Sequence, residues 1–206
     1  FMAKPPESLF GKLKAAFLTS TSKFVINNSN AVIAVSNRVK DIISQSSLPR
    51  KIAVIHNGVD IEKFKPAKKR GTMALWVGDN PNLKGFKHAL EITKKKGVKL
   101  LAVGLSSESN ADVEFIPNVP SEQMPEIYRR CFLLIYPSKW EGHPLVPLEA
   151  MASGLDIIAS RESNIELLPL KGNHYVAPGK LARKIAEKNT WHIVRTKYRK
   201  FYDELN

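Results

Sequence analysis

Apolar residues along the 206-residue chain alternate between helical spacing and the short runs typical of strands, and Gly, Pro, Asn or Ser stands at most of the switches. The first part of the chain predicts a helix with the apolar stripe Leu9, Leu13, Phe17 and Phe24, a strand over 31–35, a helix over 38–44 capped by Ser36, and a strand over 51–55. These elements form a β-α-β unit. We expect Phe17 and Phe24 to anchor the first helix on that unit rather than on a membrane.

Over 57–72 the apolar residues no longer follow a helix or strand spacing, and turn-forming and basic residues prevail, which predicts a linker. The elements predicted after it are strands over 74–77, 99–103, 113–116, 132–135 and 156–159, and helices over 85–96, from Ser121 to Arg130, and 145–153, the last one ended by Gly154. Strands separated by helices imply an α/β fold with a Rossmann-like parallel sheet and helices on both faces. At the end of the chain, the stripe Trp191, Val194, Tyr198, Phe201 and Leu205 predicts a docking helix with a basic outer side.

Charge and cysteine content narrow the class of protein. The net charge is +13, and its excess lies at the ends, since residues 1–66 carry 10 Lys and Arg against 4 Asp and Glu and residues 171–206 carry 9 against 3. Such basicity suits nucleic acid, anionic lipid or phosphate-bearing ligands equally. The lone Cys131 excludes an intramolecular disulfide and a zinc site built on several cysteines, which favours a reducing compartment.

No apolar stretch is long enough to cross a bilayer, and the first residues resemble no signal peptide. We therefore expect a cytoplasmic protein, either soluble or peripheral on the inner membrane face.

The segment 137–154 (PSKWEGHPLVPLEAMASG) carries the clearest candidate chemistry. Glu141 precedes a predicted helix and Glu149 lies about one turn inside it, both at the carboxyl edge of a parallel sheet, where open α/β sheets bind ligands. Backbone N–H groups in the first turn favour an anion at the same edge. The pattern predicts one site with donors for phosphate and carboxylates for hydroxyls. The five histidines lack metal-ligand spacing, and the usual phosphate-loop, zinc and nucleophile motifs are absent.

The spacing E-G-x-P-L-x-x-x-E-A-M-A-x-G resembles the retaining nucleotide-sugar glycosyltransferases of family 4, which have the two-lobed GT-B fold. The resemblance extends to IAVSNRVKDII, VIHNGVDIEKFKP, LWVGDNPNLKGF, the run 118–138 and the Trp191 helix. It implies a partial acceptor-side lobe over 1–56, a linker over 57–72, a nucleotide-sugar-binding lobe over 73–190, and a helix over 191–206 that returns to the first lobe.

The resemblance also implies roles for single residues. Glu141 would contact the transferred sugar and act as the catalytic residue, Glu149 would hold the ribose hydroxyls, and Lys84 would contact the diphosphate. The implied donor-binding residues are Gly78, Lys84, His143, Pro144, Leu145, Val146 and Glu149. No cofactor and no metal are implied, since the nucleoside diphosphate sugar is a substrate.

Three departures from the family pattern stand out. Gly78-Asp79-Asn80 replaces the usual arginine with an acid, His143 stands where Phe is common, and the chain holds only the last unit of the first lobe. His143 either lines the sugar site or fills the loop.

The main hypothesis is a hexosyltransferase that takes a nucleotide sugar and an unknown acceptor, with a lipid-linked glycan and an anionic membrane surface as candidate partners. One alternative is a non-catalytic remnant whose basic face binds a partner, lipid or nucleic acid, although specific nucleic-acid recognition is not expected. Another is an enzyme such as an epimerase that converts the donor without an acceptor. The nucleotide, the sugar, the acceptor and the oligomeric state stay open.

Overall fold

The computed structural model describes the backbone of residues 9–205 and the side chains of residues 18–205. The chain forms two compact units. The first comprises residues up to His56 together with Thr196 onward, and the second comprises Asn57–Arg195. Each unit is described by itself below.

The first unit is built around two parallel strands. Its elements are α1 (Leu9–Asn27), β1 (Val32–Ala34), α2 (Asn37–Ser46), β2 (Ile52–Val54) and the end of α7 (Trp191–Asp203). Ile33 pairs with Ala53 in the parallel register, and α2 packs on both strands. The side chain of Ser36 accepts a hydrogen bond from the Val39 N–H at 3.2 Å, as predicted for an N-cap. The expected β-α-β unit is confirmed.

Phe24, one of the two predicted anchors of α1, is not buried. Phe24 is 69% exposed, and its neighbour Val25 is 61% exposed. Its ring therefore does not anchor α1 on the described part of the first unit. The side chain of Phe17 lies outside the described residues.

The C-terminal stripe is buried only in part. Val194 and Phe201 are buried, whereas Trp191 is 47% and Leu205 39% exposed, so the prediction is wrong for these two residues. Within the first unit, the Lys51 ammonium lies 5.1 Å from the centre of the Phe201 ring and 3.1 Å from a carboxylate oxygen of Glu204. The C-terminal residues therefore join the first part of the chain in one unit, while the basic side of α7 is exposed.

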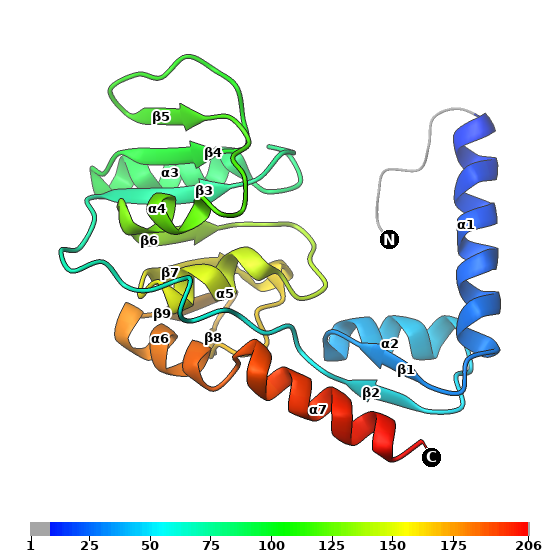
Figure 1. Cartoon of the computed structure of the whole chain (residues 1–206). Helices are drawn as coiled ribbons and strands as arrows, with labels where there is room; N and C mark the ends of the chain where they lie inside the picture. The colour runs from blue at the N-terminus through cyan, green and yellow to red at the C-terminus, as the bar shows by residue number, and fades with distance from the viewer. Residues whose placement is uncertain (1–8, 206) are drawn as a thin grey trace. The chain divides into compact units, whose positions relative to one another are not determined.

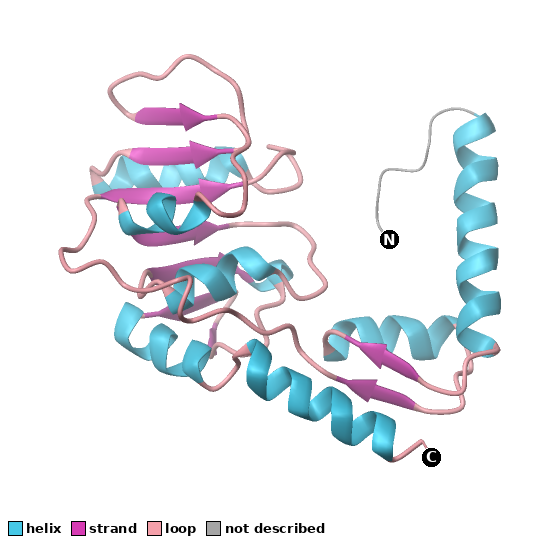
Figure 2. Ribbon diagram, viewed as in Figure 1, coloured by secondary structure: helices cyan, strands magenta, loops and turns pink. Residues whose placement is uncertain are grey.

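The second unit contains a seven-stranded sheet in the order β5-β4-β3-β6-β7-β9-β8 (Figure 2). The strands are β3 (Met73–Val77), β4 (Leu100–Val103), β5 (Val113–Ile116), β6 (Cys131–Tyr136), β7 (Asp156–Ser160), β8 (Leu170–Lys171) and β9 (His174–Ala177). The strands β3 to β7 pair in parallel, as predicted. The hairpin β8–β9, which pairs antiparallel to β7, was not predicted.

Helices cover both faces of this sheet, which confirms the Rossmann-like expectation. They are α3 (Phe86–Lys96), α4 (Met124–Arg129), α5 (Leu145–Ala152), the 3-10 helix η1 (Arg161–Ser163) and α6 (Gly179–Glu187). The helix α3 lies on one face, and α4 and α5 lie on the other (Figure 1). The helix α6, also not predicted, packs against α5 and β7.

The predicted cap of α4 is wrong. This helix begins at Met124 with Gln123 at the N-cap position, and the Ser121 hydroxyl donates to the Glu122 carboxylate instead. Pro125 lies in the first turn, where its missing N–H costs nothing, so the proline sets a later start than the serine suggested.

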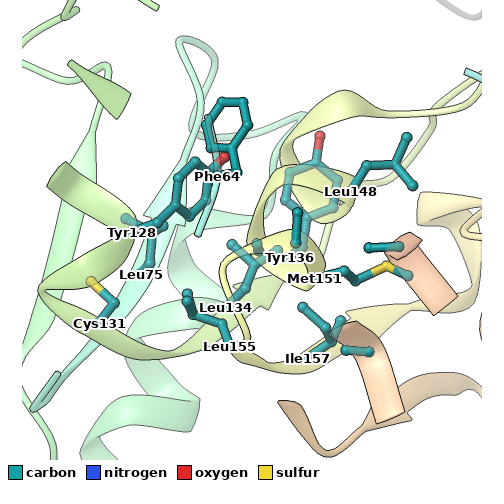
Figure 3. Close-up of a cluster of buried hydrophobic side chains, with 14 of the residues drawn as sticks. Phe64, Leu75, Tyr128, Cys131, Leu134, Tyr136, Leu148, Met151, Leu155 and Ile157 are labelled. Carbon is teal, nitrogen blue, oxygen red and sulfur yellow. The ribbon is translucent and has the colours of Figure 1, made fainter. Parts of the chain in front are cut away.

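Buried aliphatic and aromatic side chains from β6, α4 and α5 form the larger core cluster of the second unit (Figure 3). The segment 57–72 contributes Val59 and Phe64, both buried, to that cluster. The Arg183 guanidinium of α6 donates to the carbonyls of Phe64 at 3.1 Å and Ala152 at 2.5 Å. Cys131 is 3% exposed, as expected for a small buried apolar residue. Within the described part of the chain, no helix is both long and apolar enough to span a bilayer.

Candidate active site

Two loops meet at the carboxyl edge of the adjacent parallel strands β3 and β6. The first loop follows Val77, and the second follows Tyr136. They touch at Gly85, whose φ is +65°, because a Cβ there would lie 2.2 Å from the Pro137 carbonyl oxygen. The Lys139 N–H also donates to the carbonyl of Leu83 at 2.9 Å. Only glycine permits both the left-handed backbone and the close approach.

The structure brings Lys84 and Glu141 together from these two loops. The Lys84 Nζ lies 2.6 Å from Glu141 Oε1, and the two side chains are 21% and 13% exposed. The same oxygen accepts hydrogen bonds from the Tyr136 hydroxyl at 2.7 Å and the Ser138 hydroxyl at 2.8 Å. Three donors therefore fix one oxygen of this carboxylate.

Gly78 and Trp76 position the lysine. A Cβ on Gly78 would lie 2.7 Å from Lys84 Cγ, so the aliphatic stem of the lysine rests on this glycine. The buried Trp76 indole N–H donates to the Lys84 carbonyl at 2.9 Å. Any larger residue at position 78 would push the lysine away from the carboxylate.

Glu149 is held separately, on α5. Its Oε2 accepts a hydrogen bond from the Tyr128 hydroxyl at 2.7 Å. Burial raises the pKa of Glu149, while the Tyr128 hydrogen bond and the Lys63 charge oppose that rise. Burial, with the Glu149 charge as a second cause, raises the pKa of Tyr128 well above its ordinary value. The phenol is therefore a hydrogen-bond donor at neutral pH.

Side-chain amides fix the backbone of the glutamate loop. Asn164 donates to the Gly142 carbonyl at 2.6 Å, and Asn57 donates to the His143 carbonyl at 2.7 Å. His143 itself is 6% exposed, so it lies within the loop packing. Asn164 adopts a left-handed backbone with φ of +53°, a conformation that Asn tolerates better than most residues.

The helix start next to the loop offers backbone donors. Pro144 is the N-cap of α5 and provides no side-chain cap, and Leu145 and Val146 are the first helical residues. Leu145 is 45% exposed. Because the N–H groups of a first turn lack intrahelical partners, this end of the helix favours an anion.

Asp79 adds a negative charge beside the same loops. Burial raises the pKa of Tyr136, and the charges of Glu141 and, to a smaller extent, Asp79 add to that effect. The acid that replaces the usual arginine therefore acts electrostatically on the residues around Glu141. Among the described residues, no group of three or more His, Cys, Asp or Glu side chains could hold a metal ion.

Sequence reasoning identified Glu141, Lys84 and Glu149 but not the residues that hold them. Tyr128 and Tyr136 lie in apolar runs, where an aromatic side chain predicts core packing rather than a hydroxyl contact. Ser138, Asn57 and Asn164 carried no local signal for their partners, which lie up to 86 positions away in the sequence. The contacts of Tyr128, Asn164 and Asn57 join residues 21, 22 and 86 positions apart and need the folded chain, whereas Tyr136 and Ser138 lie five and three positions from Glu141.

Comparison with known proteins identifies the family of the chain. Residues 59–200 match the family model "Glycosyl transferases group 1", and residues 4–63 match "Glycosyltransferase Family 4". The chain is 26% identical to the O-antigen chain mannosyltransferase RfbU of Salmonella typhimurium over 190 residues, which cover 84% of this chain and 53% of that protein. It is 27% identical to the Escherichia coli UDP-Gal:alpha-D-GlcNAc-diphosphoundecaprenol alpha-1,3-galactosyltransferase, with coverage of 66% and 44%.

Solved structures share the fold. The sucrose-phosphate synthase of Thermosynechococcus elongatus superposes with a TM-score of 0.76 at 18% identity, covering 100% of this chain and 64% of that one. Anabaena HepE, solved in complex with UDP and glucose, gives a TM-score of 0.62 at 19% identity, covering 82% and 56%.

The chain spans about half the length of these two curated relatives. Its family match nevertheless includes both glutamates, the lysine loop and the start of α5. The chain belongs to the group 1 glycosyl transferases, in glycosyltransferase family 4.

Proposed function

We propose that the second unit is the donor-binding lobe of a retaining hexosyltransferase that uses a nucleoside diphosphate sugar. The observation that carries this proposal is the placement of Glu141 and Glu149 by different phenols, beside Lys84 and the start of α5. One edge of the sheet thus offers a cation and backbone N–H groups for a diphosphate and two carboxylates for hydroxyls.

The proposed roles follow from these surroundings. Glu149, pointing from α5, accepts a hydrogen bond from a ribose hydroxyl, and Glu141 accepts one from the transferred sugar. When the bond between the sugar and the diphosphate breaks, negative charge grows on the leaving diphosphate. Lys84 and the first N–H groups of α5 stabilise that charge. His143 and Pro144 shape the loop between the two carboxylates.

Donor binding requires Lys84 to change partners. Its ammonium lies 2.6 Å from Glu141 Oε1, whereas the proposed role needs it on a phosphate oxygen. Tyr136 and Ser138 keep donating to Glu141 when the lysine leaves, so the carboxylate stays in place. The exchange frees Glu141 to accept a sugar hydroxyl.

The names of relatives guide the choice of donor and acceptor. UDP and glucose occupy the HepE structure, and the Escherichia coli relative is named for UDP-galactose and a diphosphoundecaprenol acceptor. We therefore propose a UDP-hexose as the donor and a lipid-linked glycan as the acceptor, with the reaction at the cytoplasmic face of a membrane.

Isothermal titration calorimetry tests the donor proposal. We expect saturable binding of one of UDP, GDP and ADP, unchanged by magnesium and weakened by Glu149→Ala. Removing a hydrogen bond to a charged group lowers affinity by about tenfold or more. The matched control is Glu108→Ala, an exposed acid in the loop after β4. No binding at millimolar nucleotide would refute the proposal.

One observation favours a second function, binding through the basic first unit. Residues 1–56 and 196–206 carry 11 Lys and Arg against 4 Asp and Glu, and the basic side of α7 is exposed. Such a charge attracts anionic lipid. Co-sedimentation with anionic but not neutral vesicles, lost at high salt, would support it, and equal recovery with both vesicle types would exclude it.

A further inference from the structure

Tyr128 holds one oxygen of the carboxylate assigned above to the ribose. The residue lies on α4 and is fully buried, and its hydroxyl is 2.7 Å from Glu149 Oε2. The same hydroxyl is 3.3 Å from the Val146 carbonyl in the first turn of α5. Because a phenol has one proton, the shorter contact to the charged oxygen receives it.

Core packing fixes the position of this phenol. The Phe64 ring packs edge-on against Tyr128, with ring centroids 5.6 Å apart and planes at 81° (Figure 3). The Tyr128 ring also belongs to the core cluster with Leu148 and Met151 of α5. The hydroxyl therefore cannot follow a moving carboxylate, and the carboxylate is held where the phenol stands.

Only one carboxylate oxygen of Glu149, Oε1, is therefore available to a ligand. Among the described residues the structure gives Oε1 no hydrogen bond, whereas Oε2 is occupied by Tyr128. The charged group facing the carboxylate from another segment is Lys63, whose ammonium lies over the Phe64 ring. A ligand hydroxyl that reaches Oε1 finds an acceptor whose orientation is already set.

We infer that Tyr128 is a positioning residue that makes the nucleotide site selective for nucleotides that carry ribose hydroxyls over analogues that lack them. The inference rests on the proposed function, in which Glu149 binds the ribose. A nucleotide without ribose hydroxyls cannot donate to Glu149 Oε1, and sites built to bind a ligand hydroxyl reject analogues that lack it. The selectivity depends on Tyr128 because a free carboxylate would turn toward other donors.

The first experiment compares UDP with 2′,3′-dideoxyuridine diphosphate by calorimetry on the full 206-residue chain. The unaltered chain should bind UDP about tenfold more tightly than the dideoxy analogue. Tyr128→Phe should remove most of that preference by lowering the affinity for UDP. The affinity of this variant for the analogue should stay within about twofold of that of the unaltered chain. The double variant Tyr128→Phe/Glu149→Gln should lose no more UDP affinity than Glu149→Gln alone.

The second experiment needs no ligand. Carbon-13 NMR of labelled glutamate side chains follows the titration of Glu149 directly. Because the Tyr128 hydrogen bond lowers the pKa of this group, Tyr128→Phe should raise that pKa further. The matched control is Tyr136→Phe, which removes a buried phenol from Glu141 and should leave the Glu149 titration unchanged.

The outcomes separate this inference from the proposed function. If Glu149→Ala leaves UDP affinity unchanged, the proposed ribose role fails, and this inference fails with it. If UDP affinity depends on Glu149 but Tyr128→Phe weakens both nucleotides equally, Tyr128 has only a structural role. An unchanged Glu149 pKa in Tyr128→Phe would overturn the inference whatever the ligand does.

Discussion

Replacing Lys84 with methionine tests two roles of this residue. One is its ion pair with Glu141, which affects stability, and the other is its proposed contact with the diphosphate, which affects nucleotide affinity. Removing one partner of a fully buried ion pair costs about 3–5 kcal/mol, because the other charge stays buried. The Glu141 side chain is 13% exposed, and Tyr136 and Ser138 continue to donate to the same oxygen. We therefore expect Lys84→Met to lower the free energy of unfolding of the second unit by about 2 kcal/mol.

The double variant Lys84→Met/Glu141→Gln should recover most of that loss. A neutral amide oxygen accepts the same two hydroxyl bonds without a buried charge, so stability should return to within about 1 kcal/mol of the unaltered chain. Nucleotide affinity should not recover. We expect about a tenfold loss of UDP affinity in both variants, since the ammonium is absent from each.

Urea unfolding followed by tryptophan fluorescence measures the stability change. All three tryptophans belong to the second unit, and the fully buried Trp76 donates to the Lys84 carbonyl. If the double variant is destabilised by the sum of the two single changes, the ion pair is not coupled and the reasoning is refuted. If UDP affinity returns with stability, Lys84 does not contact the diphosphate.

Four further changes test other parts of the site. Gly85→Ala should lower the free energy of unfolding in urea by about 3 kcal/mol, because its backbone is left-handed and the new Cβ would clash with the Pro137 carbonyl. Gly97→Ala has a similar φ of +62° but no neighbouring atom to clash with, so it should cost about 1 kcal/mol. Asp79→Asn should raise UDP affinity several-fold in calorimetry at low salt and less at high salt, because a repelling charge is lost. Burial raises the pKa of Glu149, so the stability that its protonated form contributes is lost as pH rises through that pKa. Glu149→Gln should therefore gain stability relative to the unaltered chain in urea unfolding as pH rises above 4.5, the ordinary pKa of glutamate. Burial raises the pKa of the Cys131 thiol to about 12, so a thiol reagent should modify it only after unfolding.

Each of these expectations has a clear contrary result. Equal losses for the two glycine variants would show that the loop contact at Gly85 is relaxed. Unchanged affinity in Asp79→Asn would place this acid away from the diphosphate. If the difference in unfolding free energy between Glu149→Gln and the unaltered chain does not change with pH, water reaches the Glu149 carboxylate. Rapid labelling of Cys131 in the folded chain would show the same for this thiol.

The parallel sheet and the edge that holds the site could be predicted from sequence because both depend on local patterns. Short apolar segments separated by amphipathic helices indicate a parallel sheet but do not define its strand order. In such a sheet the carboxyl ends of β3 and β6 lie at the same edge. Lys84 and Glu141 follow those two strands, so their meeting was accessible from chain order and the family resemblance. Their 2.6 Å contact depends on Gly78 and Gly85, which let the loops approach.

The missed elements had weaker or conflicting signals. Gly172-Asn173 is a two-residue turn signal between β8 and β9, and Gly172 has φ of +59°, but the flanking strands are too short to show alternation. Ser121 matches an N-cap residue, yet Pro125 shifts the helix start. The hydroxyl partners of Tyr128 and Tyr136 could not be read from sequence, because an aromatic ring in an apolar run packs the same way with or without such a partner.

The backbone carbonyls of the glutamate loop are held from outside the loop, in addition to the contacts of the Glu141 side chain. Ser160, the last residue of β7, donates to the Ser138 carbonyl at 2.6 Å, and Asn164, in the segment after β7, donates to the Gly142 carbonyl at 2.6 Å. The exposed Lys139 and the half-buried Trp140 can therefore be exchanged without altering the shape of the loop. In evolutionary terms, such a loop can exchange its exposed side chains by single substitutions while the Glu141 carboxylate keeps its place.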